Sequence, residues 1–160
     1  MLHINIICIG KIKETFFKDS IDEYSKRLSK YCSLNIVELP DEKIPTNPSD
    51  KEISIIKDKE GQNILNNLKK DSYVICMDLK GKQYTYEDFS KKIENISINN
   101  NSSITFIIGG SLGISNNVLN VSNELISFSK MTFPHQLFRV ILLEQIYRAF
   151  KIIKNETYHK

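Results

Sequence analysis

Five short apolar runs alternate with segments of helical periodicity, and this alternation constrains the fold more than any other feature of the sequence. The apolar runs predict strands, and they cover residues 2–9, 34–39, 73–79, 104–108 and 124–129. The intervening segments predict helices over residues 14–31, 49–69 and 85–96, a short one from 115 and a last one from about 134. Such alternation predicts an α/β fold, with a mainly parallel sheet and helices on both faces.

Local signals indicate where several of these elements begin or end. Ser49 and Glu52 have the spacing of a capping box at the start of the second helix. Thr85 is a looser cap before the third helix, and Ser115 can cap the short one. Gly81 is expected to end the third strand.

Length and composition bound the class of protein. The 160 residues suffice for one domain, taken as residues 1–160, with a full hydrophobic core. The formal net charge of +3 permits an RNA partner without requiring one. An odd number of cysteines without a secretory signal favours a reducing compartment, and no apolar run approaches the roughly 20 residues that a membrane helix needs. We therefore expect a cytoplasmic protein with no membrane partner.

Three loops are candidates for ligand binding, because ligands of open parallel sheets bind where the strands end. They are the exit of the third strand near 77–81, the GGSLG turn at 109–113 and the SFSKMTF stretch at 127–133. The glycine turn matches neither the dinucleotide fingerprint nor a P-loop. On spacing alone, a ligand cradle and a plain tight turn remain open alternatives for it.

The last helix is apolar around most of its circumference, yet it carries Arg139 within the apolar face. Such a helix needs burial beyond the sheet, and a partner subunit would provide it. A buried guanidinium without a counter-charge is costly, so Arg139 must meet an anion or open into a cleft. The residues alone leave a structural ion pair and a functional role both open, and the ion pair is the interpretation they favour.

Two other polar features could carry chemistry. His135 lies four residues before Arg139, on the same side of the helix, where a hydrogen-bonding role at the helix start is the plainer interpretation. Tyr158 and His159 end the chain in a short polar tail that could stack on a base. No histidines have metal-ligand spacing, so we expect no metal site.

Several sequence blocks resemble one family of bacterial enzymes. GGSLG follows the fourth strand, ISFSKMTFPHQLFRVILLEQIYRAFKI spans the fifth strand and the last helix, and YHK ends the chain. Together with IGKIKE and the PDEK loop near the start, they resemble the ribosomal RNA large subunit methyltransferase H family over the whole length, looking most like members from staphylococci or near relatives. The SFSKMTFPHQ block is highly specific, and the glycine turn is much less so.

The resemblance implies a SPOUT-class fold, an α/β domain with a C-terminal trefoil knot (here about residues 104–160) that works as a homodimer. Periodicity could not have indicated the knot, because knots are rare enough to be excluded by default. The knot loops of this class hold S-adenosylmethionine. Carried over by position, the implied cofactor contacts are Met77, where relatives often have leucine, Gly109, Phe128, Ser129, Lys130, Met131, Thr132 and Phe133.

The resemblance also implies the reaction, which is direct methyl transfer to N3 of a pseudouridine in 23S rRNA of the assembled ribosome. This reaction needs alignment and loss of the N3 proton, and a nearby cation would stabilise the developing negative charge. We expect Arg139 to supply this charge or bind an RNA phosphate, with support from His135. Tyr158 and His159 are expected to close over the target base, from the same or the partner subunit.

Three rival functions remain open. A knotted methyltransferase acting on tRNA would share the cofactor loops and differ in the FPHQ block and the YHK tail. A ribosome-binding factor that retains the fold without catalysis would not bind S-adenosylmethionine. A nucleotide-binding Rossmann-like enzyme is disfavoured because neither phosphate-binding glycine fingerprint is present.

Overall fold

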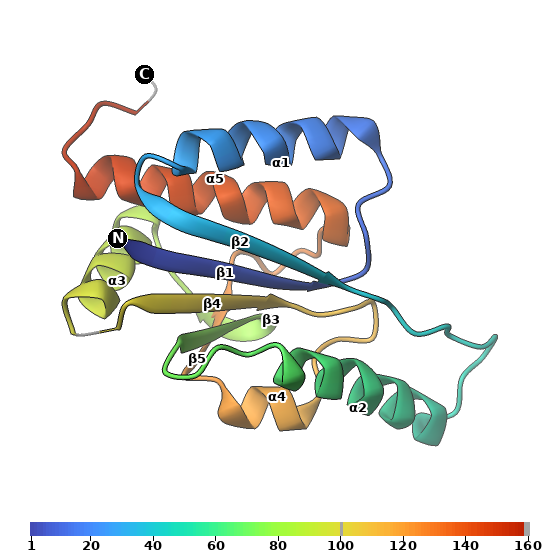
Figure 1. The fold of residues 1–160 in the computed structure, drawn as a ribbon. Coiled ribbons are helices and arrows are strands. Elements are labelled where there is room, and N and C mark those ends of the chain that lie inside the picture. Colours follow the sequence, from blue (N-terminus) through green and yellow to red (C-terminus); the bar gives the residue numbers. More distant parts are fainter. Residues whose placement is uncertain (100, 159–160) are drawn as a thin grey trace.

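The computed structural model describes residues 1–99 and 101–158. All strands of its five-stranded sheet run parallel, in the order β2-β1-β4-β3-β5 (Figure 1). The strands are β1 (Leu2–Ile9), β2 (Cys32–Leu39), β3 (Tyr73–Gln83), β4 (Ser103–Ile108) and β5 (Glu124–Ser127). The helices are α1 (Thr15–Leu28), α2 (Asp50–Asn66), α3 (Tyr86–Ile98), α4 (Asn116–Val121) and α5 (His135–Ile153). The predicted α/β fold is confirmed.

Helices cover both faces of the sheet, which explains why its central strands are apolar on both sides. Helices α1, α3 and α5 pack on one face, and α2 with α4 packs on the other (Figure 1). Along β1, Ile4 and Ile6 belong to the core under α1, α3 and α5, whereas Ile7 and Ile9 belong to the core under α2 and α4. The carboxyl ends of the strands are thereby left between two helical layers.

The predicted caps are present, with one exception. Ser49 and Glu52 exchange both hydrogen bonds of a capping box, and the Thr85 hydroxyl accepts from a backbone N–H of α3. Ser115 precedes α4 as expected, but its side chain makes no capping bond. Its hydroxyl is buried without a partner among the described residues, and it lies where a side chain on Gly61 would clash. Ser115 therefore packs against α2.

Strand β3 differs from the prediction, because Gly81 does not end it. The strand runs to Gln83 and changes register on β5, so that Met77 and Lys82 both pair with Ile126. Residues 78–81 therefore bulge out of the ladder. A bulge re-aims the side chains next to it, and this one projects at the carboxyl edge of the sheet.

Helix α5 obtains much of its cover from its own chain. It packs between α1 and α3 as well as on the sheet, and among its residues, all of them described, Leu137 is the one that is exposed. The expectation that this helix needs burial beyond the sheet is met by flanking helices. A partner subunit is thus not required to explain the apolar composition of α5.

Candidate functional site

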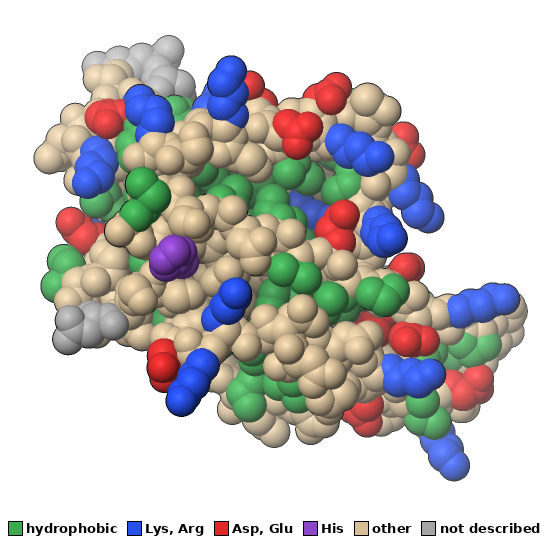
Figure 2. Space-filling model, in the orientation of Figure 1, with side chains coloured by type: hydrophobic (Ala, Val, Ile, Leu, Met, Phe, Trp, Pro, Cys, Tyr) green, Lys and Arg blue, Asp and Glu red, His purple; other side chains and the backbone are tan. Residues whose placement is uncertain are grey.

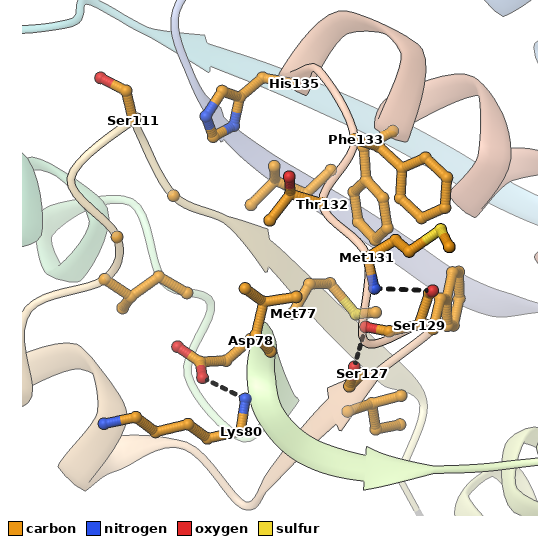
Figure 3. A pocket seen from close by; sticks show the side chains of 18 of the residues that line it. Met77, Asp78, Lys80, Ser111, Ser127, Ser129, Met131, Thr132, Phe133 and His135 are labelled. Atoms are coloured by element: carbon orange, nitrogen blue, oxygen red, sulfur yellow. Dashed lines mark hydrogen bonds between the residues drawn. The ribbon is translucent and has the colours of Figure 1, made fainter.

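A cavity of about 730 Å³ opens at the carboxyl ends of β3, β4 and β5 (Figure 3). Its lining comes from residues within 77–80, 108–114 and 126–135, together with Phe138 of α5. These are the three loops that the sequence predicts for ligand binding, and the fold brings them to one site. Parallel α/β sheets bind ligands at this edge.

The bulge of β3 forms one wall of the cavity. The backbone N–H of Lys80 donates to Oδ1 of Asp78 at 2.8 Å, which closes a tight turn at the tip of the bulge. Gly81 then passes close over β5, because an added Cβ would lie 2.5 Å from the carbonyl carbon of Ile126. Only glycine fits at this crossing, so the wall depends on it.

The glycine turn after β4 forms a second wall, and it is both a tight turn and part of the cavity. Gly113 has φ of +93° and donates its N–H to the carbonyl of Gly110 at 3.0 Å. A Cβ on Gly109 would come within 2.7 Å of Ile114, and one on Gly110 within 2.8 Å of Oε1 of Glu60. The turn therefore packs its backbone directly against its neighbours.

The loop after β5 is held by its own serines. The hydroxyl of Ser127 donates to the carbonyl of Ser129 at 2.9 Å, and the hydroxyl of Ser129 accepts from the N–H of Met131 at 3.0 Å (Figure 3). The side chain of Met131 is 75% exposed although it lines the cavity. Lys130 does not line the cavity, unlike the other positions of 126–135.

Aromatic rings join this loop to α5. The rings of Phe128 and Phe138 have centroids 5.5 Å apart, and those of Phe133 and Phe138 are 6.3 Å apart and stacked. Phe128 also meets Phe89 of α3 edge to face at 5.7 Å. The loop therefore rests on a layer of rings, and the cavity combines apolar walls with the backbone groups of two irregular segments.

His135 is the first residue of α5, and its side chain lines the cavity. In Figure 3 the ring lies on the same side of the cavity as Ser111. Burial, with a smaller contribution from the charge of Arg139, lowers the pKa of His135 below its usual range. The imidazole is therefore neutral at neutral pH, a state in which it can accept a proton or a hydrogen bond.

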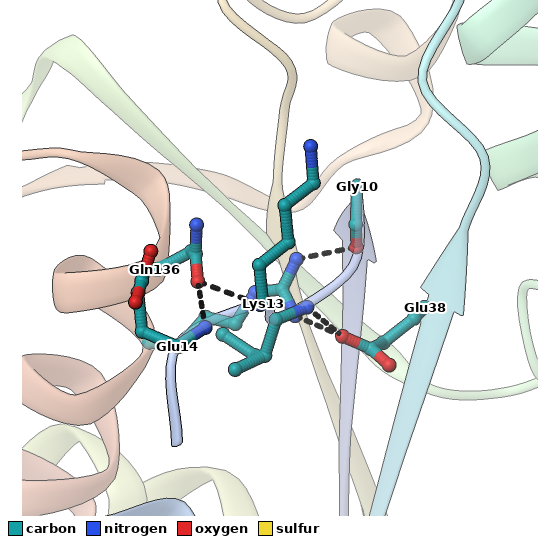
Figure 4. A network of polar contacts seen from close by, with 7 residues as sticks. Gly10, Lys13, Glu14, Glu38 and Gln136 are labelled. Atoms are coloured by element: carbon teal, nitrogen blue, oxygen red, sulfur yellow. Dashed lines mark hydrogen bonds and ion pairs between the residues drawn. The ribbon is translucent and has the colours of Figure 1, made fainter. Parts of the chain in front are cut away.

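Arg139 is buried, with 3% of its side chain exposed, and it does not line the cavity. Its Nη1 forms an ion pair with Oε2 of Glu38 at 2.5 Å, and its Nη2 donates to the carbonyl of Gly10 at 2.6 Å (Figure 4). This is the structural ion pair that the sequence favours. The guanidinium thereby joins α5 to the ends of β1 and β2.

The C-terminal tail folds back onto α5. The hydroxyl of Tyr158 donates to Oε2 of Glu144 at 2.7 Å, and Arg148 lies 4.5 Å from the centre of the Tyr158 ring. Glu144 follows His135 by nine residues, which is roughly 13 Å along a helix. Tyr158 is not among the residues lining the cavity of this chain, and His159 lies outside the described residues.

Other kinds of site receive little support from the described residues. No group of three or more His, Cys, Asp or Glu side chains among them could hold a metal ion. The three cysteines are free and buried, and burial raises the pKa of Cys8 to about 12 and that of Cys76 to about 11. Within the same residues, every helix is too short or too polar to cross a membrane.

Comparison with known proteins decides the family. The family described as "Predicted SPOUT methyltransferase" matches residues 2–159. "Ribosomal RNA large subunit methyltransferase H" of Clostridium botulinum (strain Langeland) is 63% identical over 159 residues, covering 99% of this chain and all of the relative. The protein of the same name from Clostridium beijerinckii is 61% identical with the same coverage. The chain belongs to this methyltransferase H family.

Solved structures show the same fold at low sequence identity. A probable methylase family protein from Haemophilus influenzae has a TM-score of 0.52 at 13% identity, covering 98% of this chain and 70% of that one. A tRNA (m1G37) methyltransferase from Aquifex aeolicus has a TM-score of 0.52 at 14% identity, covering 99% and 76%. The SPOUT fold implied by the resemblance is thus shown. The two relatives named above come from clostridia, and the sequence had suggested staphylococci or near relatives.

Beyond the positions carried over for the cofactor, the cavity of this methyltransferase H family member is lined by residues to which the sequence assigned no individual role. All the positions carried over for the cofactor line it except Lys130. Asp78 and Lys80 line it because β3 bulges, and Phe138 lines it one helical turn after Pro134. Asp78 and Lys80 lie in the loop near 77–81 that the sequence predicts for ligand binding, whereas Phe138 lies outside all three predicted loops.

Proposed function

We propose that this protein transfers a methyl group from S-adenosylmethionine to N3 of a pseudouridine in 23S rRNA, acting on the assembled ribosome. The observation that carries the proposal is the cavity, which is built from the β3 bulge, the glycine turn and the SFSKMTF loop. The curated relatives at 61–63% identity are named for methylation of large-subunit ribosomal RNA. Within a SPOUT methyltransferase, such a cavity is the natural place for the methyl donor.

The residues around the cavity fit this donor. A volume of about 730 Å³ lies in the range for a nucleoside-sized ligand. Met77 and Ile114 offer apolar walls for an adenine ring, and the close-packed glycines leave backbone groups open to it. The carboxylate of Asp78 can accept hydrogen bonds or face positive charge. When bound, the cofactor supplies an electrophilic methyl group on a sulfonium.

The chain itself must align the target base and manage the N3 proton. We assign His135 to the support of this step, because its neutral imidazole lines the cavity. Arg139 is proposed to supply positive charge near the base or an RNA phosphate. Its guanidinium is held by Glu38 and Gly10, so direct contact requires that it exchange one of these partners.

Tyr158 and His159 are proposed to close over the target base from a partner subunit. Tyr158 is bound to Glu144, about 13 Å along α5 from His135, so the tail of the same chain is turned away from its own cavity. A homodimer would bring a second tail within reach. Leu137 of α5, with Met131 and Phe133 of the preceding loop, offers exposed apolar surface for such an interface.

The remaining family features belong to the same proposal. A trefoil knot over about residues 104–160 would include the two loops after β4 and β5 that line the cavity. A ribosomal substrate places the enzyme in the cytoplasm. The chain is a single domain of 160 residues with a charge of +3, so a large preformed RNA surface must supply much of the recognition.

The test is transfer of labelled methyl to ribosomes that lack the modification, with protein-free rRNA and tRNA as controls. Label on a pseudouridine of large-subunit rRNA, in intact ribosomes only, is the expected result. Label on tRNA would keep the cofactor site and overturn the substrate. Absence of S-adenosylmethionine binding by calorimetry would favour a ribosome-binding factor without catalysis.

A further inference from the structure

The segment that joins β1 to α1, residues 10–14, is irregular in conformation yet fixed in place. Gly10, at φ of +97°, donates its N–H to the carbonyl of Leu39 at 2.6 Å and accepts from Arg139 through its own carbonyl. The N–H of Ile12 donates to Oε2 of Glu38 at 2.8 Å. A segment without secondary structure is thereby bound to the end of β2 and to α5.

Gln136 completes this attachment from the first turn of α5. Its Oε1 accepts from the backbone N–H of Lys13 at 2.9 Å and from that of Glu14 at 3.4 Å. Figure 4 shows these bonds beside the Glu38 contacts, with the side chain of Lys13 pointing away from them. Gln136 directly follows His135, which lines the cavity, and Ile9, just before the segment, lies against Gly110 of the glycine turn, so the attached segment lies beside the cavity.

Two cations project from this fixed segment. The side chains of Lys11 and Lys13 are exposed, and neither forms an ion pair with any acidic residue in the described part of the chain. Of the acidic groups in this network, Glu38 already neutralises Arg139, and Glu14 forms no ion pair with either lysine in the described part of the chain. Figure 2 shows lysine and arginine side chains exposed at the end of the molecule where β1 leads into α1, with acidic side chains among them.

We propose that residues 10–14 form a fixed basic arm whose two lysines, Lys11 and Lys13, bind RNA backbone phosphates beside the methylation site. This inference rests on the proposed function and names the surface that meets the RNA. The backbone anchors hold the arm before binding, so little conformational entropy is lost when the phosphates arrive. Ammonium groups on flexible stems bind phosphate as point charges and read no base sequence, which suits a positioning contact.

Phosphates are the anion that best fits this surface. An acidic protein patch would need a larger complementary face with an apolar centre, whereas the arm offers two separate charges on a short segment. The arm also adjoins the cavity in which the base would react, so phosphates near the target nucleotide are within its neighbourhood. Contacts of this kind weaken steeply as salt concentration rises.

The experiment compares kcat/KM for ribosomes lacking the modification between the wild-type protein and Lys11→Ala/Lys13→Ala, over a series of KCl concentrations. We expect the double variant to raise KM for ribosomes roughly tenfold with little change in kcat. The slope of log kcat/KM against log salt should fall in magnitude by roughly 1.5, because two phosphate contacts are lost. Affinity for S-adenosylmethionine, measured by calorimetry, should stay unchanged.

Two further variants separate charge from attachment. Lys69→Ala/Lys70→Ala removes two exposed lysines that precede β3 and so lie at the amino ends of the strands, whereas the arm lies at the carboxyl ends. This variant should keep the wild-type KM and salt slope. Gln136→Leu keeps both arm lysines but removes the acceptor that holds Lys13 and Glu14. We expect it to raise KM by less than the double variant and to leave the salt slope nearly unchanged.

The outcomes distinguish the arm from the proposed function. Suppose that the wild-type protein methylates ribosomes and that Lys11→Ala/Lys13→Ala has the same KM and the same salt slope. The proposed phosphate-binding role of the arm would then be wrong, and the proposed function would stand. An equal loss in the Lys69→Ala/Lys70→Ala control would overturn that role as well, because it would show a general charge effect. If the wild-type protein methylates no ribosomes, the proposed function is wrong. The affinity of the same variants for ribosomes, measured by filter binding, still tests whether the arm binds RNA.

Discussion

Two irregular segments meet at the start of α5, and they differ in how their polar groups are satisfied. The loop of residues 128–134 forms few bonds beyond its own serines, and it lines the cavity with exposed side chains such as Met131. The segment of residues 10–14 is bonded to Glu38, Gln136 and Arg139, and none of its residues lines the cavity. Irregular backbone at one sheet edge can thus serve either as a ligand wall or as a fixed support.

The difference predicts that the two segments respond to mutation in opposite ways. Changes that remove the side chains holding the fixed segment should lower stability and spare cofactor binding. Changes around the cavity should lower cofactor binding, and they should lower stability only where the backbone itself must move.

Removal of Glu38, the anion on β2 that holds the fixed segment, should have the largest effect. Glu38→Ala leaves the guanidinium of Arg139 buried without its carboxylate and removes the acceptor of Ile12. We expect the free energy of unfolding in urea to fall by about 3 kcal/mol, near the lower end for a broken buried pair because the Glu38 side chain is 35% exposed. Affinity for S-adenosylmethionine should change little.

The matched control for this change is an exposed ion pair. Glu23→Ala breaks the ion pair between Glu23, 53% exposed, and Arg27, 43% exposed. It should lower the free energy of unfolding by less than about 0.5 kcal/mol. If Glu38→Ala and Glu23→Ala cost the same, the network at the end of β2 is not a fixed support, and the contrast between the two segments fails.

The crossing of β3 over β5 should give the next largest effect. Gly81→Ala places a Cβ 2.5 Å from the backbone of Ile126, so the bulge that forms the cavity wall must shift. Overpacking of this kind costs about 2 kcal/mol of stability. We expect affinity for S-adenosylmethionine, measured by calorimetry, to fall more than about tenfold.

Gln83→Ala is the control for this crossing, since Gln83 is exposed at the end of the same strand. It should leave both stability and affinity near the wild-type values. Unchanged affinity in a folded Gly81→Ala protein would show that the bulge is not part of the cofactor site.

The alternation of strands and helices could be predicted from the sequence, and so could the three loops, because each depends on local patterns. The attachment of residues 10–14 could not, since Gln136 and Lys13 are 123 residues apart and meet only once the sheet has formed. The bulge was missed for a related reason. Gly81 is a local signal for a strand end, but the crossing over Ile126 lets the strand continue.

The environment of Arg139 could be predicted only in part from the sequence. Its place in an apolar face correctly predicts a buried charge that needs an anion. Nothing in the local pattern identifies Glu38 as that anion, because β2 lies far away in the sequence. Likewise, the apolar composition of α5 predicts extensive burial, but α1 and α3 provide it and local periodicity cannot indicate which neighbours do so.

A smaller effect is expected from the pH dependence of cofactor binding. Burial holds the pKa of His135 below the ordinary value of 6.5, so the ring is neutral at pH 7 and above. Acid that protonates it places a cation in the cavity, against the sulfonium of the cofactor. Calorimetry should give a constant Kd from pH 7 to 8.5 and a Kd that rises by at most about tenfold per pH unit in acid.

The stability of the fold should also fall in acid, because of the same proton on His135. The unfolded chain binds the proton of His135 more readily than the folded chain, so this contribution to stability is complete above pH 6.5 and declines as pH falls below it. His135→Gln should flatten both profiles. A Kd profile in His135→Gln as steep as in the wild type would assign the acid effect to another group.

The smallest expected effect concerns the most exposed side chain of the cavity. Met131 is 75% exposed, so Met131→Ala should change the free energy of unfolding by less than about 0.5 kcal/mol. A flexible thioether can nevertheless fold over a bound ligand, and we expect affinity for S-adenosylmethionine to fall about threefold. Ile55→Ala, an exposed apolar change on α2, should alter neither quantity. A loss of stability without loss of affinity in Met131→Ala would mean that the loop after β5 is a support like residues 10–14, and the contrast between open and fixed segments would then have to be abandoned.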